Sequence, residues 1–317
     1  MSAIYLSEDD VVRLLDMPAA IDVVAEAFRH WSLERAGNQP RRRISAQGIT
    51  LHTMSAADHE LGMVGCKVYT TTRAAARFQF HLFNLHGELL AIISADRLGQ
   101  MRTGAVSGVA TQFMARPDAA IVGCFGTGWQ ARAQLEAICA VRKIQHIQVY
   151  GRDAGRRERF AAEMSERCGV TVEPVHAPED AAAEKDIVIT ATTSKTPVFD
   201  GRVLEEGTHL CVIGSNYLSK AEVDLATIRQ ADHIICDSID ACMLEAGDFV
   251  QVAEDSGFDY VRAKELRDVI AGREVGRTKP EEITLFKSVG LALEDLAVGA
   301  LVYRRAEEQG LGQKLPW

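Results

Sequence analysis

Hydrophobic positions recur with helical spacing at the start of the chain and with strand-like spacing after it. Ser7 and Asp10 have the spacing of a capping box, and the apolar residues that follow predict a short helix. A second helix is expected from Pro18 to about residue 31, because proline suits the first helical turn. Runs of β-forming residues then predict a mostly antiparallel sheet over 48–54, 65–70, 78–84 and 89–94. A helix rich in small residues is expected over 97–115.

From residue 119 the pattern changes to alternating strands and helices. Strands are expected at 121–125, 147–150, 170–175, 187–191, 209–213 and 233–236, with helices at 130–142 and 156–168. A last amphipathic helix over 288–308 is long enough to cross back to the first domain. The expected fold class is therefore α/β, with a Rossmann-type doubly wound parallel sheet domain at 119–287. The remainder predicts an α+β domain at 1–118, completed by the C-terminal helix segment 288–317.

The first strand of the second domain leads into a glycine-rich turn, Gly126-x-Gly128-x-x-Ala131, and a helix follows at once. Gly126 permits a tight bend, Gly128 lets the backbone approach a pyrophosphate, and Ala131 lets the helix pack against the strand. The strand before it and the helix and strand after it favour a nicotinamide or flavin dinucleotide over a simple packing turn. The positions expected to bind this cofactor are Gly126, Thr127, Gly128, Trp129, Gln130, Arg152, Asp153, Thr192, Gly214 and Ser215.

The residues after the next strand bear on the choice between NAD and NADP. Arg152 can hold a 2'-phosphate, whereas Asp153 can accept a hydrogen bond from a 2'-hydroxyl or cap the next helix. The strand end does not decide between the two cofactors, and our prediction favours NADP.

Composition excludes several other classes of function. The chain has 317 residues, of which 47% are hydrophobic, and a net charge of -9 without any long basic run. Nucleic acid and membrane partners are therefore not expected. The N-terminus has no leader pattern and no segment is apolar enough to span a bilayer, so we expect a cytoplasmic protein. The seven cysteines lack metal-type spacing, so no metal site is predicted.

No Ser/His/Asp or Cys/His nucleophile is apparent, so the dinucleotide is expected to carry the difficult chemistry. Lys67 lies within an apolar strand, where an unpaired ammonium is costly, although strand alternation can also turn it to solvent. Arg102 begins a helix with few other charges, and Arg42 lies in a basic run at 41–43. Both arginines can bind a carboxylate through two hydrogen bonds.

These residues belong to segments that resemble one known family, the ornithine cyclodeaminase/mu-crystallin family, over essentially the whole chain. The matching segments are Gln39-Pro40-Arg41-Arg42, Gly65-Cys66-Lys67-Val68, Met101-Arg102-Thr103-Gly104-Ala105-Val106-Ser107, Gly126-Thr127-Gly128-Trp129-Gln130-Ala131, Gly214-Ser215-Asn216 and Thr284-Leu285-Phe286-Lys287-Ser288-Val289-Gly290. The resemblance implies a dimer with an NAD(P) domain and a separate substrate and dimerisation domain. It also implies hydride transfer at a carbon that bears nitrogen, as in archaeal-type alanine dehydrogenase and imino-acid reductases.

By this resemblance, Arg42, Lys67 and Arg102 match the positions that bind and polarise the substrate carboxylate and imine nitrogen. Two departures argue against deamination. Asn216 stands where cyclodeaminases carry an aspartate, and a neutral amide cannot act as a general base. The glutamate that cyclodeaminases carry close to the position of His52 is also missing.

The prediction is an NAD(P)H-dependent imino-acid reductase that forms an L-amino acid from a small 2-imino carboxylate. The expected catalytic residues are Lys67, Arg102 and Asn216, and the expected substrate-binding residues are Arg42, Lys67, Arg102, Arg77 and His52. Arg77, with Arg73, can meet a second carboxylate or be a surface residue. Candidate substrates are pyrroline-2-carboxylate, iminosuccinate and iminopyruvate. The alternatives are an ornithine or lysine cyclodeaminase, an alanine dehydrogenase-like enzyme, and an NADPH-dependent ligand-binding protein of the mu-crystallin sort.

Overall fold

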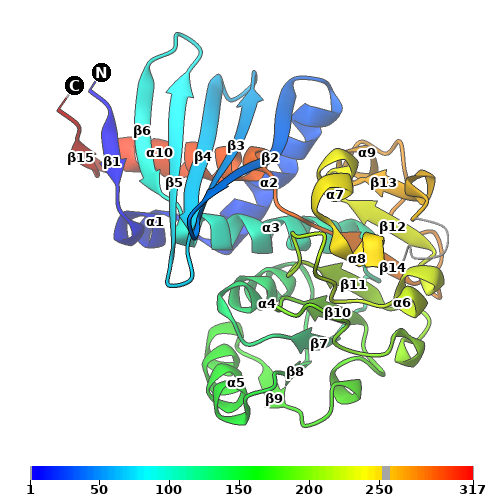
Figure 1. The fold of residues 1–317 in the computed structure, drawn as a ribbon. Helices are drawn as coiled ribbons and strands as arrows, with labels where there is room; N and C mark the ends of the chain where they lie inside the picture. The colour runs from blue at the N-terminus through cyan, green and yellow to red at the C-terminus, as the bar shows by residue number, and fades with distance from the viewer. Residues whose placement is uncertain (1, 252–257, 317) are drawn as a thin grey trace. The chain divides into compact units, whose positions relative to one another are not determined.

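The computed structural model describes residues 2–251 and 258–316 and divides the chain into two compact units (Figure 1). Unit 1 comprises Met1–Val106 and Leu291–Trp317, and unit 2 comprises Ser107–Gly290. The chain therefore enters unit 1 twice, and its last helix belongs to that unit. The first division falls within helix α3 (Asp96–Met114), whereas the sequence analysis placed it at residue 118.

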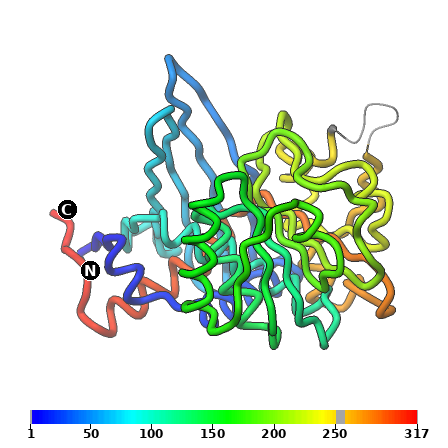
Figure 2. Tube along the Cα trace, turned by 90° about the horizontal axis from the view of Figure 1, so that it is seen from below, coloured from blue at the N-terminus to red at the C-terminus, as the bar shows by residue number. Residues whose placement is uncertain are grey.

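Over the described residues, unit 1 contains a seven-stranded sheet with the order β15-β1-β6-β5-β4-β3-β2. Its strands are β1 (Ile4–Leu6), β2 (Ala36–Ala46), β3 (Ile49–Asp58), β4 (Met63–Thr71), β5 (Ala76–Asn84), β6 (Leu89–Ser94) and β15 (Gln313–Lys314). Strands β2 to β6 pair antiparallel, and β1 joins the sheet parallel to β6. Because β1 also pairs with β15, the two terminal segments of the chain lie side by side (Figure 2).

The helices of unit 1 cover one face of this sheet. They are α1 (Glu8–Leu14), α2 (Met17–Ser32), α10 (Ala292–Gln309) and the first part of α3. The capping box expected at the start of α1 is present, because Asp10 N–H donates to Ser7 Oγ and Ser7 N–H donates to the Asp10 carboxylate. Helix α10 runs across the sheet behind β2 to β5 (Figure 1). We call the face under α10 the inner face and the opposite one the outer face.

Close packing on the inner face depends on one glycine. A Cβ added at Gly65 would lie 2.2 Å from the Phe80 ring and 3.1 Å from the side chain of Leu296 in α10. Since side chains alternate along a strand, Lys67 and Tyr69 share this face with Gly65. The lysine in the middle of β4 is therefore directed into the interior of the unit.

Unit 2 contains a parallel sheet of eight strands in the described residues, with the order β13-β12-β14-β11-β10-β7-β8-β9. The strands are β7 (Ile121–Phe125), β8 (His146–Tyr150), β9 (Thr171–Pro174), β10 (Ile187–Thr190), β11 (His209–Val212), β12 (His233–Cys236), β13 (Ala263–Glu265) and β14 (Thr284–Lys287). The helices are α4 (Trp129–Val141), α5 (Ala154–Cys168), α6 (Leu225–Gln230), α7 (Ile239–Glu245), α8 (Gly247–Gln251) and α9 (Leu266–Ile270), besides the later part of α3. The expected α/β class with a doubly wound parallel sheet is confirmed. Strands β13 and β14 were not predicted from the sequence.

Asp237, at the end of β12, fixes the segment that leaves unit 2. Its Oδ2 accepts hydrogen bonds at 2.8 Å from Ser288 Oγ and from the backbone N–H groups of Val289 and Gly290. A single buried carboxylate thus determines the path of the chain before it returns to unit 1. Among the described helices, none has both the length and the apolar character needed to cross a membrane.

Candidate active site

Lys67 forms the centre of a buried charged cluster in unit 1. Its side chain is almost fully buried, and its Nζ donates to Asp295 Oδ1 of α10 at 2.8 Å. Burial is the largest influence and lowers the pKa of Lys67 to about 8. The charges of Arg102 and Arg41 act in the same direction, and Asp295 opposes them. The lysine can therefore exchange a proton near neutral pH, which is the property required of a general acid or base.

Arg102, near the start of α3, joins the same cluster. Its Nη1 donates to Glu294 Oε2 at 2.8 Å and its Nε to Asp295 Oδ1 at 3.3 Å. Both acids are fully buried. Asp295 Oδ2 is buried as well and accepts no hydrogen bond from the described residues. A buried acceptor of this kind is costly unless a ligand satisfies it, so the cluster has a feature of a binding site.

The two acids were missed in the sequence analysis. Their signal is present in the sequence, because Glu294 and Asp295 interrupt an otherwise apolar stretch of the last helix. Adjacent acids on a buried helix indicate buried cationic partners, and Lys67 and Arg102 were already candidates.

The basic run on β2 is placed differently from our expectation. A bulge between Gln39 and Arg42 puts two residues opposite one in the pairing with β3. As a result Arg41 lies on the inner face and is buried, whereas Arg42 pairs with Thr53 on the outer face and is exposed. Arg41, and not the predicted Arg42, therefore lies on the face of Lys67, and its charge acts on the pKa of that lysine.

His52 on β3 lies on the inner face and is almost fully buried. Its ring stacks on Tyr69 with centroids 4.1 Å apart, and its Nε2 is 2.9 Å from Thr71 Oγ1. Burial, with the charges of Arg43 and Arg41, lowers the pKa of His52 to about 4. The imidazole is therefore neutral near pH 7 and contributes hydrogen bonds rather than charge.

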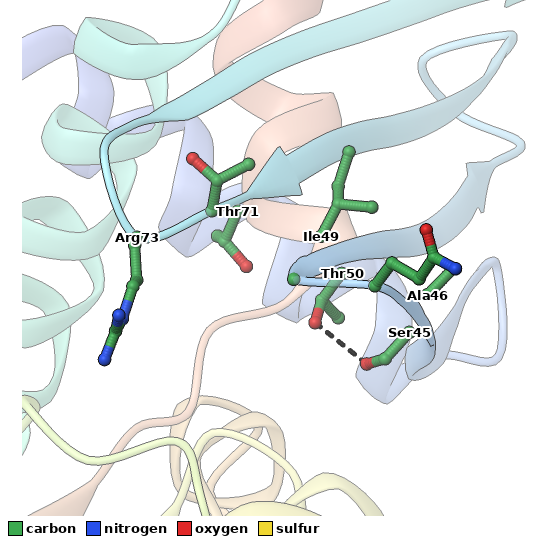
Figure 3. A pocket seen from close by; sticks show the side chains of 9 residues that line it. Ser45, Ala46, Ile49, Thr50, Thr71 and Arg73 are labelled. Carbon is green, nitrogen blue, oxygen red and sulfur yellow. Dashed lines mark hydrogen bonds between the residues drawn. The ribbon is translucent and has the colours of Figure 1, made fainter.

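A cavity of about 430 Å³ lies at the tips of the β2–β3 and β4–β5 hairpins (Figure 3). Arg73 and Thr71 line it on one hairpin, and Ser45 and Thr50 on the other, where their hydroxyls are 2.8 Å apart. Arg77 is not among its lining residues. It pairs with Thr70 on the outer face and is exposed, so the structure does not bring it together with Lys67.

The glycine-rich turn of unit 2 has the geometry that a dinucleotide requires. Gly126 has φ +111°, and a Cβ there would lie 2.4 Å from the carbonyl oxygen of Ala191, so only glycine fits. A Cβ at Gly128 would meet nothing within 4 Å, and the N-terminus of α4 has no side-chain cap. Gln130 Oε1 in the first turn accepts no hydrogen bond from the described residues. The turn thus offers open space and uncapped N–H groups to a pyrophosphate.

The residues after β8, Arg152 and Asp153, differ in their surroundings. Asp153 is the N-cap of α5, and its Oδ1 accepts from Arg156 N–H at 2.8 Å. Arg152 is exposed. A cavity of about 370 Å³ lies beside the glycine-rich turn, and its lining residues are Thr127, Gly128, Trp129, Arg132, Arg156, Arg159 and Phe160. The capping interpretation thus accounts for Asp153, and the surroundings of this turn are rich in arginine.

The loops after β10 and β11 carry the other predicted residues. Both strands end at the same edge of the parallel sheet, where ligands bind in doubly wound folds. Thr192 follows β10, while Gly214, Ser215 and Asn216 follow β11. The structure therefore brings these four residues to the edge of the sheet that also carries the Gly126 turn.

Fold and site together define a class of protein: a Rossmann-type dinucleotide-binding protein with a separate α+β unit that carries a buried lysine–arginine centre. The particular family follows from comparison with known proteins. Residues 1–310 match the model of the ornithine cyclodeaminase/mu-crystallin family, and the chain belongs to that family. The resemblance noted in the sequence is thereby confirmed.

Individual relatives cover nearly the full chain. A Delta(1)-pyrroline-2-carboxylate reductase of Bacillus cereus is 34% identical, covering 98% of this chain and 99% of the relative. The structure of the Thermococcus litoralis Delta(1)-pyrroline-2-carboxylate reductase with NADH and L-proline is 32% identical, with a TM-score of 0.93, and covers 98% and 100% of the two chains. An archaeal alanine dehydrogenase dimer with bound NAD is 30% identical, with a TM-score of 0.93 and full coverage of both chains.

Proposed function

We propose that the protein is an NAD(P)H-dependent imino-acid reductase that converts a small 2-imino carboxylate into an L-amino acid. The observation that carries the proposal is the buried Lys67, held by Asp295 and accompanied by Arg102, in a member of this family whose unit 2 has a glycine-rich turn suited to a dinucleotide. When bound, the nicotinamide supplies the hydride to the carbon of the C=N bond. Pyrroline-2-carboxylate is the first candidate, because two similar relatives are reductases of that compound. Iminosuccinate and iminopyruvate are the others.

The residues of unit 1 bind the substrate and supply the proton. Arg102 and Arg41 have the charge and the burial needed to bind the substrate carboxylate, and Arg41 takes over the role first assigned to Arg42. Lys67 donates a proton to the substrate nitrogen. Its lowered pKa makes it a stronger acid than an ordinary lysine at neutral pH. His52, neutral and hydrogen-bonded to Thr71, contributes to the shape and polarity of this face.

The residues of unit 2 hold the cofactor. Backbone N–H groups at Thr127 to Gln130 bind the pyrophosphate, and Asn216 orients the substrate at the nicotinamide end. We propose NADP as the preferred form. Arg152 is exposed just after β8, and Arg156 and Arg159 line the cavity beside the glycine-rich turn, whereas Asp153 is engaged as a helix cap. A cytoplasmic location is part of the same proposal.

The outer face of the unit 1 sheet supports a homodimer. Ile44 is 71% exposed, and Leu51 and Val64 are each 37% exposed on this face. A sheet face with several exposed apolar side chains is typical of a protein interface, and a second copy of the chain is the proposed partner. Light scattering after size exclusion tests this proposal: Leu51→Asp is expected to halve the measured mass, and a wild-type protein of 35 kDa in solution would contradict it.

The activity is tested by steady-state assays of the three imines with NADH and with NADPH. Oxidation of either cofactor supports the proposal, and the imine with the highest kcat/KM identifies the substrate. Release of ammonia from ornithine or lysine without net cofactor oxidation would instead indicate a cyclodeaminase. Cofactor binding without any turnover would indicate a ligand-binding protein. Either result would refute the reductase proposal.

A further inference from the structure

Glu222 is a buried acid with no place among the proposed substrate-binding and cofactor-binding residues. It is fully buried in unit 2, in the segment between β11 and α6. Its Oε1 accepts the backbone N–H of Thr192 at 2.6 Å, and its Oε2 accepts that of Gly214 at 2.6 Å. Oε2 also accepts the Thr190 hydroxyl at 3.0 Å. One carboxylate thus joins the loop after β10 to the loop after β11.

These two loops are pressed closely together. A Cβ added at Gly214 would lie 2.4 Å from the carbonyl oxygen of Thr192 and 2.5 Å from Glu222 Oε1. No other residue type fits at Gly214 without moving one of these groups. The Glu222 carboxylate therefore fixes a contact that tolerates little displacement.

Two further buried charged residues, Asp248 and Lys287, hold Glu222 and the loop after β11. Asp248 Oδ1 accepts the backbone N–H of Glu222 at 2.6 Å. Lys287, fully buried at the end of β14, pairs with Asp248 Oδ2 at 2.7 Å and donates to the carbonyl oxygen of Ser215 at 2.9 Å. Burial is the largest influence on Glu222 and raises its pKa together with the charge of Asp248, while Lys287 and the hydrogen bonds from Thr192 act in the opposite direction. The cluster of Glu222, Asp248 and Lys287 thus contains two acids and one cation, and each of them forms a hydrogen bond with the backbone of these loops.

We infer that Glu222 is a positioning residue, which sets the relative placement of the Thr192 and Gly214–Asn216 loops and through them that of the nicotinamide and of Asn216. The inference rests on the proposed function, because that function makes these loops the nicotinamide end of the cofactor site. Glu222 reaches the reaction only through the backbone groups that it holds. Its effect therefore falls on the nicotinamide end of the cofactor and spares the ADP part, whose pyrophosphate is assigned to the Gly126 turn.

The substitution Glu222→Gln tests this directly. Both carboxylate oxygens accept a backbone N–H, but an amide has one acceptor and one donor group, so it can hold only one of the two loops. The control is Asp224→Asn. Asp224 is an acid of the same unit whose two oxygens accept backbone N–H groups of Gly201 and Thr227, which are nine and thirteen residues further along the chain than Thr192 and Gly214.

The readouts are the dissociation constants of NADH and of ADP-ribose, which lacks the nicotinamide, followed by kcat with the best imine. For E222Q we expect the dissociation constant of NADH to rise by roughly tenfold or more, because one charge-assisted hydrogen bond is lost. The dissociation constant of ADP-ribose should stay within about twofold of the wild-type value. For D224N the two ligands should change together. The inference would be overturned if E222Q weakened the binding of NADH and of ADP-ribose equally. It would also be overturned if neither dissociation constant nor kcat changed.

A second variant and the choice of binding assays separate this inference from effects on folding and from the proposed function. If E222Q does not fold, Glu222→Asp replaces it, because this variant keeps the charge but is one methylene too short to reach both loops. The same difference between NADH and ADP-ribose is expected. Because the binding measurements need no imine, a wild-type protein that reduces none of the imines would refute the proposed function alone.

Discussion

The Lys67–Asp295 ion pair predicts the pH dependence of the reaction. Nζ and Oδ1 are 2.8 Å apart in a fully buried setting. At an effective dielectric constant of about 20, two unit charges at this distance attract by roughly 6 kcal/mol, which corresponds to about four pKa units. Reorganisation and water entry reduce this value, so we expect Asp295→Asn to lower the pKa of Lys67 by at least about one unit.

The sign of the effect follows from the proposed role of Lys67 as a proton donor. In the wild type, kcat/KM for imine reduction should fall as pH rises through about 8, the pKa of Lys67. In D295N the cation loses its partner, the neutral amine is favoured, and the fall in activity should move to about pH 7 or below. The assay is NADH or NADPH oxidation with the best imine between pH 5.5 and 10, with folding checked by thermal denaturation.

The neighbouring Glu294 provides a matched control. It is equally buried, and its Oε2 accepts a hydrogen bond from Arg102 Nη1 at 2.8 Å, whereas Asp295 accepts one from Lys67 itself. Glu294→Gln should therefore move the alkaline limb much less than D295N does. If the alkaline limb of D295N stays at the wild-type pH, or moves upward, Lys67 is not the group that titrates and the reasoning is refuted.

Three other substitutions have distinct expected outcomes. Lys67→Ala should lower kcat by about 10²- to 10⁴-fold with the dissociation constant of NADH unchanged, and a parallel loss of NADH affinity would contradict a role confined to the substrate. Arg41→Ala should raise KM for the imine by about 10- to 100-fold while Arg42→Ala changes it less than about twofold, and the opposite ranking would show that the outer-face arginine binds the substrate. Gly126→Ala should cost roughly 1–3 kcal/mol of unfolding free energy and most of the NADH affinity, because its Cβ would meet the carbonyl oxygen of Ala191 at 2.4 Å; an unchanged melting temperature would argue against this strain.

Local chemistry explains which parts of the molecule were predictable. The turn at Gly126 was found because its left-handed backbone and close approach to Ala191 require glycine, and such requirements leave a fixed spacing in the sequence. The capping box at Ser7 was found for the same reason, since its hydrogen bonds join residues three apart. Lys67 could be singled out but not assigned from alternation alone, because its partner Asp295 lies 228 residues further along the chain.

The errors come from features that sequence patterns do not encode. The bulge on β2 reverses the alternation after Gln39 and exchanges the faces of Arg41 and Arg42, so the matching motif alone pointed to the wrong neighbour for Lys67. Strand β14, Thr284–Lys287, ends in a lysine that is buried in an ion pair with Asp248, 39 residues earlier in the chain, so its sequence does not have the apolar pattern of a buried strand. Glu222 could not be recognised, because its partners are backbone groups, which every sequence contains.

The division of unit 1 between the two ends of the chain has a consequence for biosynthesis. A ribosome completes the contiguous unit 2, Ser107–Gly290, before it adds α10, so this unit can fold while synthesis continues. Until α10 emerges, Lys67 and Arg102 lack the carboxylates of Asp295 and Glu294, and the sheet of unit 1 lacks the helix that packs against β2 to β5. The proposed catalytic centre is thus assembled only after unit 2 has been synthesised, and a nascent chain interrupted before residue 291 is expected to bind the dinucleotide without reducing an imine.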